Sequence, residues 1–88
     1  MSIRKVNGKL NVIDKNVKKL RKERCWSQAD LARELNLIGL PFHKNDVQSI
    51  EANTRTVREI ELWFLAQVFN VKMEDLITNI EVDINITV

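Results

Sequence analysis

Four polar side chains share one side of a segment predicted to be helical over about residues 44–52. Val47 and Ile50, three residues apart, face the protein interior. The opposite side carries Lys44, Asn45, Gln48 and Ser49. These side chains offer donors and acceptors that suit base edges in the major groove of DNA, where Lys can bond guanine and Asn can bond adenine. This side is therefore a candidate surface for base contacts.

The charge of the chain is divided unevenly along its length. Residues 1–58 carry thirteen Lys and Arg and six Asp and Glu, a net charge of +7, whereas residues 59–88 carry a net charge of −5. A basic first part favours contact with a polyanion. A lysine-rich helix over residues 15–24 that is merely solvated would produce the same pattern, so charge alone leaves both interpretations open.

Composition excludes several classes of protein. The chain has 88 residues, of which 44% are hydrophobic and 30% charged, as expected for one globular domain. It has no apolar run near the length of a membrane span and no apolar leader at its start, so we expect no membrane association. One cysteine excludes an internal disulfide and favours a cytoplasmic protein.

The residue types needed for metal, cofactor or covalent chemistry are scarce. With one His and one Cys, a zinc site of the Cys and His type is excluded, and two glycines argue against a glycine-rich nucleotide loop. We expect no metal and no cofactor. Cys25 and His43 are the conceivable nucleophile and base, but no third group orients them. A lone Cys beside a Trp is usually a small buried residue, so we expect no enzyme.

Helical patterns fill the middle of the chain. Asp14 is expected to cap a helix beginning at Lys15. A Ser27-x-x-Asp30 box opens a second helix, which runs to about Asn36. Gly39 and Pro41 then mark a loop before the helix at about 44–52.

Two further helices are expected after that segment. Asn53 is a plausible left-handed stop for the third helix. A Thr56-x-x-Glu59 box is expected to open a fourth helix that ends at Phe69. A last short helix is expected over residues 73–78, with acids in its first turn.

The fourth helix has apolar residues on two sides. One side is a core stripe made of Leu62, Leu65, Ala66 and Phe69. The opposite side carries Ile60, Phe64 and Val68. A helix that is apolar on two sides has two things to pack against, so we expect the second side to meet the C-terminal tail or another subunit.

Both ends of the chain look extended. Apolar and polar residues alternate over residues 79–88, with Ile80, Val82, Ile84 and Ile86 on one side, which predicts a strand. Asn7-Gly8 predicts a turn in an N-terminal extended segment or hairpin over residues 1–13. The strand could pair with this hairpin, with its mate in a dimer or with a partner protein, or it could fray. We thus divide the chain into residues 1–13, 14–78 and 79–88.

The segment from Asn16 to Ile77 resembles the phage repressor and Cro-like helix-turn-helix family, also called the xenobiotic response element (XRE) family. The matching residues are Leu20, Arg21, Ser27, Gln28, Leu31, Ala32, Val47, Gln48, Ile50, Glu51, Arg55, Leu62, Ala66, Phe69, Val71, Asp75 and Leu76. The resemblance implies a mainly α, five-helix, lambda-repressor-like domain that binds double-stranded DNA, usually as a dimer. The long spacing between Leu37 and Val47 indicates a branch with a longer turn between the second and third helices.

The resemblance also implies roles for individual residues. Lys44, Asn45 and Ser49 would read bases, and Gln48 would contact a base edge or phosphate. Gln28 would grip phosphate from the start of its helix, where free N–H groups also favour an anion. The following loop would add phosphate contacts from Asn53, Thr54, Arg55 and Thr56. Arg21 and Glu51 would form a salt bridge between the first and third helices.

Two functional hypotheses follow. The first is a sequence-specific transcriptional regulator, a repressor that occupies its operator as a dimer. The second is a protein-interaction module, such as an antitoxin or antirepressor, whose tail strand and Ile60, Phe64 and Val68 side bind a partner. An antitoxin that represses its own operator would combine the two.

Overall fold

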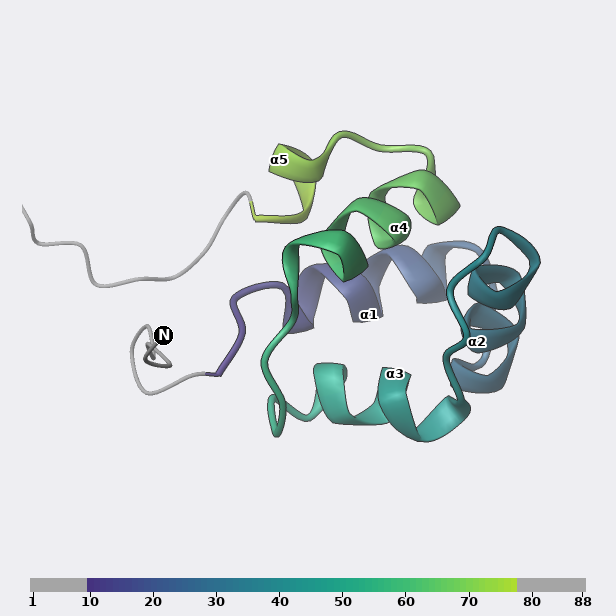
Figure 1. Cartoon of the computed structure of the whole chain (residues 1–88), viewed down its shortest axis with the longest axis horizontal. Coiled ribbons are helices and arrows are strands. Elements are labelled where there is room, and N and C mark those ends of the chain that lie inside the picture. The colour runs from purple at the N-terminus through teal and green to yellow at the C-terminus, as the bar shows by residue number, and fades with distance from the viewer. Residues whose placement is uncertain (1–9, 78–88) are drawn as a thin grey trace, which may run out of the picture.

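The described part of the chain is a small bundle of helices. The structure is a computed structural model that describes residues 10–77. These residues form α1 (Asp14–Glu23), α2 (Gln28–Leu37), α3 (Lys44–Glu51), α4 (Glu59–Phe69) and α5 (Met73–Leu76), and no strand occurs among them (Figure 1). The expected mainly α fold with five helices is therefore confirmed. The predicted tail strand and the turn at Asn7-Gly8 lie outside the described residues.

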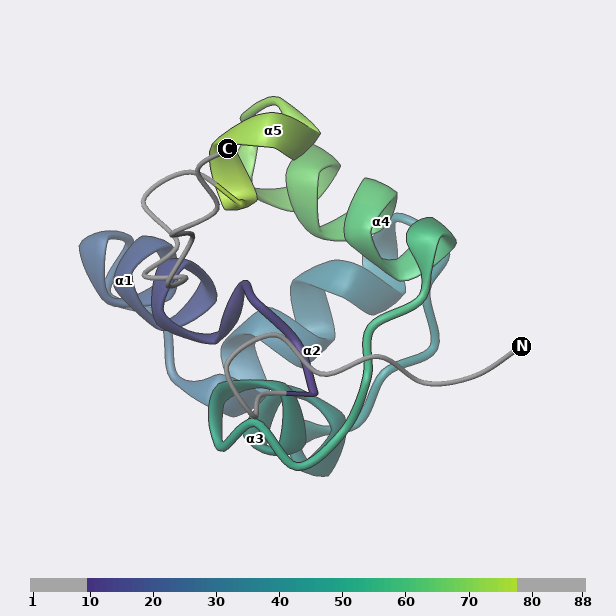
Figure 2. The same ribbon diagram turned by 90° about the vertical axis from the view of Figure 1, so that its left-hand side faces the viewer.

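The helices enclose one hydrophobic core. Figures 1 and 2 show α3 at one end of the bundle and α4 with α5 at the other, with α1 and α2 between them. Side chains from all five helices are fully buried in this core: Val17, Leu31, Leu35, Val47, Ile50, Leu65, Phe69 and Leu76. Trp26 adds its ring against Phe69, with the two centroids 6.1 Å apart. This packing fixes α3 against α1 and α2 and leaves its outer side free.

The first two helices begin in different ways. Ser27 caps α2 as expected: its hydroxyl accepts a hydrogen bond from the Asp30 N–H, and the Asp30 carboxylate accepts one from the Ser27 N–H. The predicted cap of α1 is wrong. That helix already begins at Asp14, and its N-cap is Ile13, whose N–H donates to the Asn11 side chain. Ile13 makes no side-chain capping hydrogen bond, and the Asn11 contact stabilises the turn that leads into α1.

The predicted start of α4 is also wrong. Arg58, rather than Thr56, stands at the N-cap, and the helix begins at Glu59. The acid that turns back is Glu61, whose carboxylate accepts the Arg58 N–H at 3.0 Å. Glu61 is preferred because two arginines surround it, as described below. The left-handed conformation expected at Asn53 is confirmed by its φ of 61°.

The loop between α2 and α3 packs onto the fold. It spans residues 38–43, where Leu40 and Phe42 are buried in the core. Gly39 has a φ of +112°, which a side chain rarely adopts, and a Cβ there would lie 3.6 Å from the Phe64 ring. The long turn therefore covers part of the second apolar side of α4.

That second side is divided between the chain's own core and the surface. Phe64 and Val68 are partly buried against the core, whereas Ile60 is 53% exposed and Trp63 is 46% exposed. The expectation that this whole side awaits a tail or another subunit is thus too broad. Within the described residues, Ile60 and its surroundings are the part that remains open.

Candidate nucleic-acid interface

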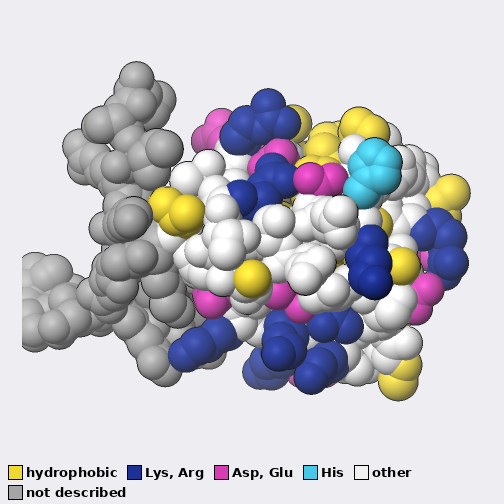
Figure 3. Space-filling model, turned by 90° about the horizontal axis from the view of Figure 1, so that it is seen from below, with side chains coloured by type: hydrophobic (Ala, Val, Ile, Leu, Met, Phe, Trp, Pro, Cys, Tyr) yellow, Lys and Arg dark blue, Asp and Glu magenta, His cyan; other side chains and the backbone are white. Residues whose placement is uncertain are grey.

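The outer side of α3 is polar and accessible. Lys44, Asn45 and Gln48 are exposed and Ser49 is half-buried, while Val47 and Ile50 on the inner side are buried. The Ser49 hydroxyl donates to the Asn45 carbonyl at 2.8 Å. Because its hydrogen is used in this bond, the Ser49 oxygen can act only as an acceptor toward a ligand. In Figure 3 this end of the molecule shows mainly white surface, of uncharged polar side chains and backbone, in its middle, and the largest group of Lys and Arg lies along the lower edge of the view.

Glu51 holds α1, α2 and α3 together beneath that surface. Its two carboxylate oxygens accept from Arg21 Nε at 2.7 Å and Arg21 Nη2 at 2.9 Å, and one of them also accepts from Gln28 Nε2 at 3.1 Å. The side chains of Arg21 and Glu51 are only 10% and 5% exposed. Hydrogen bonding to Glu51 raises the pKa of Arg21. The structure thus brings together the two residues expected to pair.

Gln28 stands at the first position of α2. Its side chain is oriented by Glu51, and the first N–H groups of its helix have no partners within the helix, which favours an anion there. Asp30 is in the same turn but is already engaged by Ser27. The hydrogen bond from the Ser27 backbone lowers the pKa of Asp30.

Lysines of α1 border this helix start. Lys18 and Lys22, one helical turn apart, line a hollow of about 330 Å³ together with Gln28 and Gln48. The floor of the hollow includes Arg21 and Glu51. The hollow joins α1, α2 and α3, so the basic edge continues from α1 to the polar side of α3.

The loop after α3 contains the four expected phosphate contacts, and two of them turn inward. The Asn53 side chain accepts from the N–H groups of Leu10 and Asn11 at 2.7 and 3.1 Å and donates to the Asn11 carbonyl at 2.9 Å. Thr54 and Thr56 are exposed, and the Thr54 hydroxyl donates to the Ser49 carbonyl at 3.3 Å. Asn53 therefore ties the start of the described chain to the end of α3.

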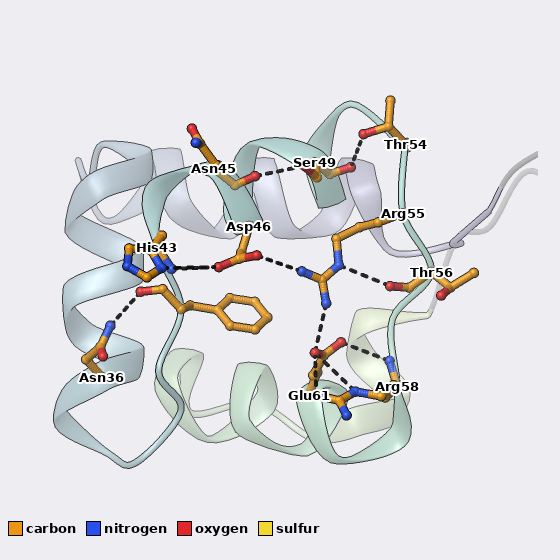
Figure 4. A network of polar contacts seen from close by, with 11 residues as sticks. Asn36, His43, Asn45, Asp46, Ser49, Thr54, Arg55, Thr56, Arg58 and Glu61 are labelled. Atoms are coloured by element: carbon orange, nitrogen blue, oxygen red, sulfur yellow. Dashed lines mark hydrogen bonds and ion pairs between the residues drawn. The ribbon is translucent and has the colours of Figure 1, made fainter.

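Arg55 also turns inward. Figure 4 shows its guanidinium pointing toward Asp46 of α3 and Glu61 of α4, on the side of α3 away from the Asn45 side chain. Its Nη1 donates to Asp46 at 3.0 Å, its Nη2 donates to Glu61 at 2.8 Å, and its Nε donates to the Thr56 carbonyl at 3.2 Å. Sequence reasoning placed Arg55 at the surface that meets phosphate.

The architecture and its polar end agree with the comparison of the sequence with known families. A family model described as helix-turn-helix matches residues 17–76. The chain belongs to the helix-turn-helix family. Members of this XRE-type family are DNA-binding regulators. No curated protein matches this helix-turn-helix chain in sequence.

The structure also places the cysteine of this helix-turn-helix protein, and it differs there from the expectation. Cys25, expected to be buried, is exposed in the turn between α1 and α2, where its backbone is left-handed with a φ of 58°. Residues 10–77 contain no group of three or more His, Cys, Asp and Glu placed to hold a metal ion. None of the helices in that range is sufficiently long and apolar to span a membrane.

Sequence reasoning missed three residues of the interface framework. Asn11 is buried and donates to the carbonyls of Ile50 and Arg55, and no local pattern marks it because its partners lie about forty positions away. Asp46, in the first turn of α3, accepts from the Arg55 guanidinium at 3.0 Å and from the His43 N–H at 2.8 Å. Glu61 is 1% exposed, and the spacing Arg58-x-x-Glu61 is the signal that could have located it.

Proposed function

We propose that this chain is a sequence-specific transcriptional regulator that binds double-stranded DNA as a dimer and represses by occupying its operator. The observation that supports it is the outer side of α3, where amide, ammonium and hydroxyl groups stand exposed beside the α1 lysines. We also assign the chain to the Cro-like branch with a long turn, on the loop over residues 38–43. The single cysteine fits action in the cytoplasm.

In this proposal the polar residues of α3, the start of α2 and the loop after α3 have different roles. Lys44, Asn45 and Ser49 contact bases, and Gln48 contacts a base edge or a phosphate. Gln28, Thr54 and Thr56 contact phosphate, which fixes the register of the protein on the duplex. Asn53 and Arg55, also expected at phosphate, direct their side chains into the protein, and we assign them to shaping the loop and α3.

Dimerisation would bring two copies of α3 to half-sites about 34 Å apart, one turn of the double helix. The proposed contact joins the tail residues Ile80, Val82, Ile84 and Ile86 to the exposed Ile60 side of α4. A specific observation also favours the alternative role in binding a protein partner. A hollow of about 410 Å³ between α4 and α5 is lined by Ile60, Trp63, Met73 and Glu59, and it could receive an apolar segment from either source.

The test of base reading compares Lys44 with a lysine far from α3. Duplexes that bind the protein are selected from a random pool, and affinity is measured on a selected and a scrambled duplex over a range of salt. Lys44→Ala and Asn45→Ala should each relax the preference at one base position by about 1–3 kcal/mol. Lys72→Ala, in the loop between α4 and α5, is the matched control and should leave the preference unchanged.

Salt dependence separates the two hypotheses. A DNA-binding regulator should lose affinity steeply as salt rises, because phosphate contacts release counterions. Equal losses for both variants on all sequences would contradict base reading. Weak binding with no selected duplex at all would favour the protein-interaction module.

A further inference from the structure

We propose that Arg55 is a positioning residue that holds α3 in its base-reading orientation by bridging two carboxylates, Asp46 of α3 and Glu61 of α4. This inference rests on the proposed function, because it concerns how the base-reading helix is oriented. It assigns to Arg55 a role other than a phosphate contact. The bridge connects the helix that meets DNA to the helix at the other end of the core.

The geometry of Arg55 fits a bridge. Its two terminal nitrogens each bond a different carboxylate, Nη1 to Asp46 at 3.0 Å and Nη2 to Glu61 at 2.8 Å. The guanidinium plane lies over the Phe42 ring, with Cζ 5.1 Å from the centroid. Only 27% of the side chain is exposed. Arg55 is thus held by α3, by α4 and by the loop before α3.

The position of Asp46 explains why its carboxylate needs a positively charged partner. An unpaired carboxylate on α3 would repel the phosphates on which the helix must dock. Asp46 Oδ1 bonds Arg55, while Oδ2 accepts the His43 N–H at 2.8 Å and lies 3.9 Å from the His43 ring nitrogen. One oxygen therefore caps α3, and the other carries the link to Arg55.

Glu61 is the fixed end of the bridge. It is 1% exposed and also bonds Arg58, through the backbone N–H at 3.0 Å and the guanidinium at 3.1 Å. A buried carboxylate needs such partners, since an unpaired charge in the interior is costly. The Arg58 guanidinium bonds Glu61, and its side chain is 73% exposed. It therefore offers a matched control for Arg55.

Lysine at position 55 distinguishes a bridge from a phosphate contact. Lys keeps the positive charge and binds phosphate well, but its single ammonium cannot reproduce the planar fork that reaches two carboxylates. A phosphate contact should therefore survive Arg55→Lys, whereas a bridge should not. Arg58→Lys makes the same chemical change on the exposed partner of Glu61.

The experiment measures the affinity ratio between a selected and a scrambled duplex, together with the slope of affinity against salt. Arg55→Lys should lower the ratio about tenfold, as expected for residues in one hydrogen-bonded network, and leave the slope unchanged because no charge is lost. Arg58→Lys should keep the wild-type ratio. Asp46→Asn keeps the contact between Arg55 and Glu61, so it tests the α3 end alone and should also lower the ratio.

The double variant Arg55→Lys with Asp46→Asn should lose no more discrimination than Arg55→Lys alone, because both changes break the same link. Two results would overturn the bridge. One is an affinity ratio for Arg55→Lys equal to that of the wild type, and the other is a loss of discrimination in the double variant equal to the sum of the two single losses. Arg55→Gln supplies a further check. A fall of about 0.9 in the salt slope, with equal losses on all duplexes, would identify a phosphate contact instead.

Hydrogen exchange of the free protein separates failure of this inference from failure of the proposed function. In Arg55→Lys and in Asp46→Asn, exchange should quicken at the amides of α3 relative to those of α1. Unchanged α3 exchange in both variants would overturn the bridge, whatever the DNA results are. If the wild-type protein prefers no duplex while α3 exchange responds as expected, the proposed function fails and the bridge stands.

Discussion

Glu51 is the carboxylate at which three helices meet. Arg21 of α1 reaches it with two nitrogens and uses its remaining terminal nitrogen on the Trp26 carbonyl at 2.8 Å, while Gln28 of α2 adds a third donor. Burial of an ion pair adds less to stability than its attraction suggests, because both charges lose their water. The contact is therefore better understood as fixing the angle of α3.

Removal of Glu51 should nonetheless be costly. Glu51→Ala leaves the Arg21 charge buried without its carboxylate, which should lower the free energy of unfolding by about 3 kcal/mol and loosen α3. Urea unfolding measures the first effect, and DNA affinity the second. Glu23→Ala, at the exposed end of α1, should change stability little. A Glu51→Ala protein that unfolds and binds DNA like the wild type would show that the pair does not position α3.

At the scale of elements, the long turn between α2 and α3 is a packed part of the fold. Leu40 and Phe42 anchor it in the core, and the Asn36 side chain donates to the Phe42 carbonyl at 2.6 Å. Gly39 makes the bend at a φ of +112°, close to the Phe64 ring. The turn can therefore be longer without leaving α3 loosely held.

Gly39→Ala should expose the strain of that bend. Alanine at this φ is unfavourable by about 1–3 kcal/mol, whereas the added methyl would make only an ordinary van der Waals contact with Phe64, so the cost comes from the backbone. Thermal unfolding should show a lower midpoint, whereas Gln67→Ala on the exposed side of α4 should not. A midpoint equal to that of the wild type would mean that the loop adopts another conformation.

Elements were easier to predict than the contacts between them. Periodicity and the Ser27-x-x-Asp30 box are local signals, so α2 and the inner side of α3 could be predicted directly from the sequence. The start of α4 was misplaced because Thr56-x-x-Glu59 and Arg58-x-x-Glu61 compete, and burial beside Arg55 decides for Glu61. Burial of that kind is a tertiary effect, which a local pattern does not contain.

In the candidate site, too, local features could be predicted from the sequence and long-range contacts could not. The polar side of α3 follows from helical spacing, and the exposed positions of Lys44 and Asn45 agree with it. The inward turn of Asn53 depends on Leu10 and Asn11, which lie more than forty residues earlier in the chain. No spacing rule connects segments so far apart. Residues that position the site through contacts with distant segments, such as Asn53, were therefore harder to predict than the exposed polar residues of α3.

At the scale of the whole molecule, two surfaces of different character are separate. The polar and basic surface involves α1, α2 and α3, whereas the apolar hollow lies between α4 and α5. The two hollows share no lining residue. A regulator that binds DNA with one surface and a second subunit with the other would use both at once.

Ile60→Glu tests the second surface. Ile60 is 53% exposed, so the change should leave the fold intact, but a charge in an apolar contact should convert the proposed dimers to monomers. Sedimentation measures the mass, and a duplex with two half-sites should then bind more weakly than in the wild type. Leu37→Glu, at a position 72% exposed on α2, is the matched control. An unchanged mass would remove Ile60 from the interface, and removal of residues 79–88 tests the tail in the same assay.

The positions of the two tryptophans have a practical consequence. The chain has no tyrosine, so its intrinsic fluorescence comes from Trp26 and Trp63 alone. Trp26 is stacked on Phe69 beside the start of α2, whereas Trp63 lines the hollow between α4 and α5 and is 46% exposed. Replacing either indole by phenylalanine leaves a single emitter. The turn between α1 and α2 and the hollow between α4 and α5 can thus be followed by fluorescence separately, without an attached dye.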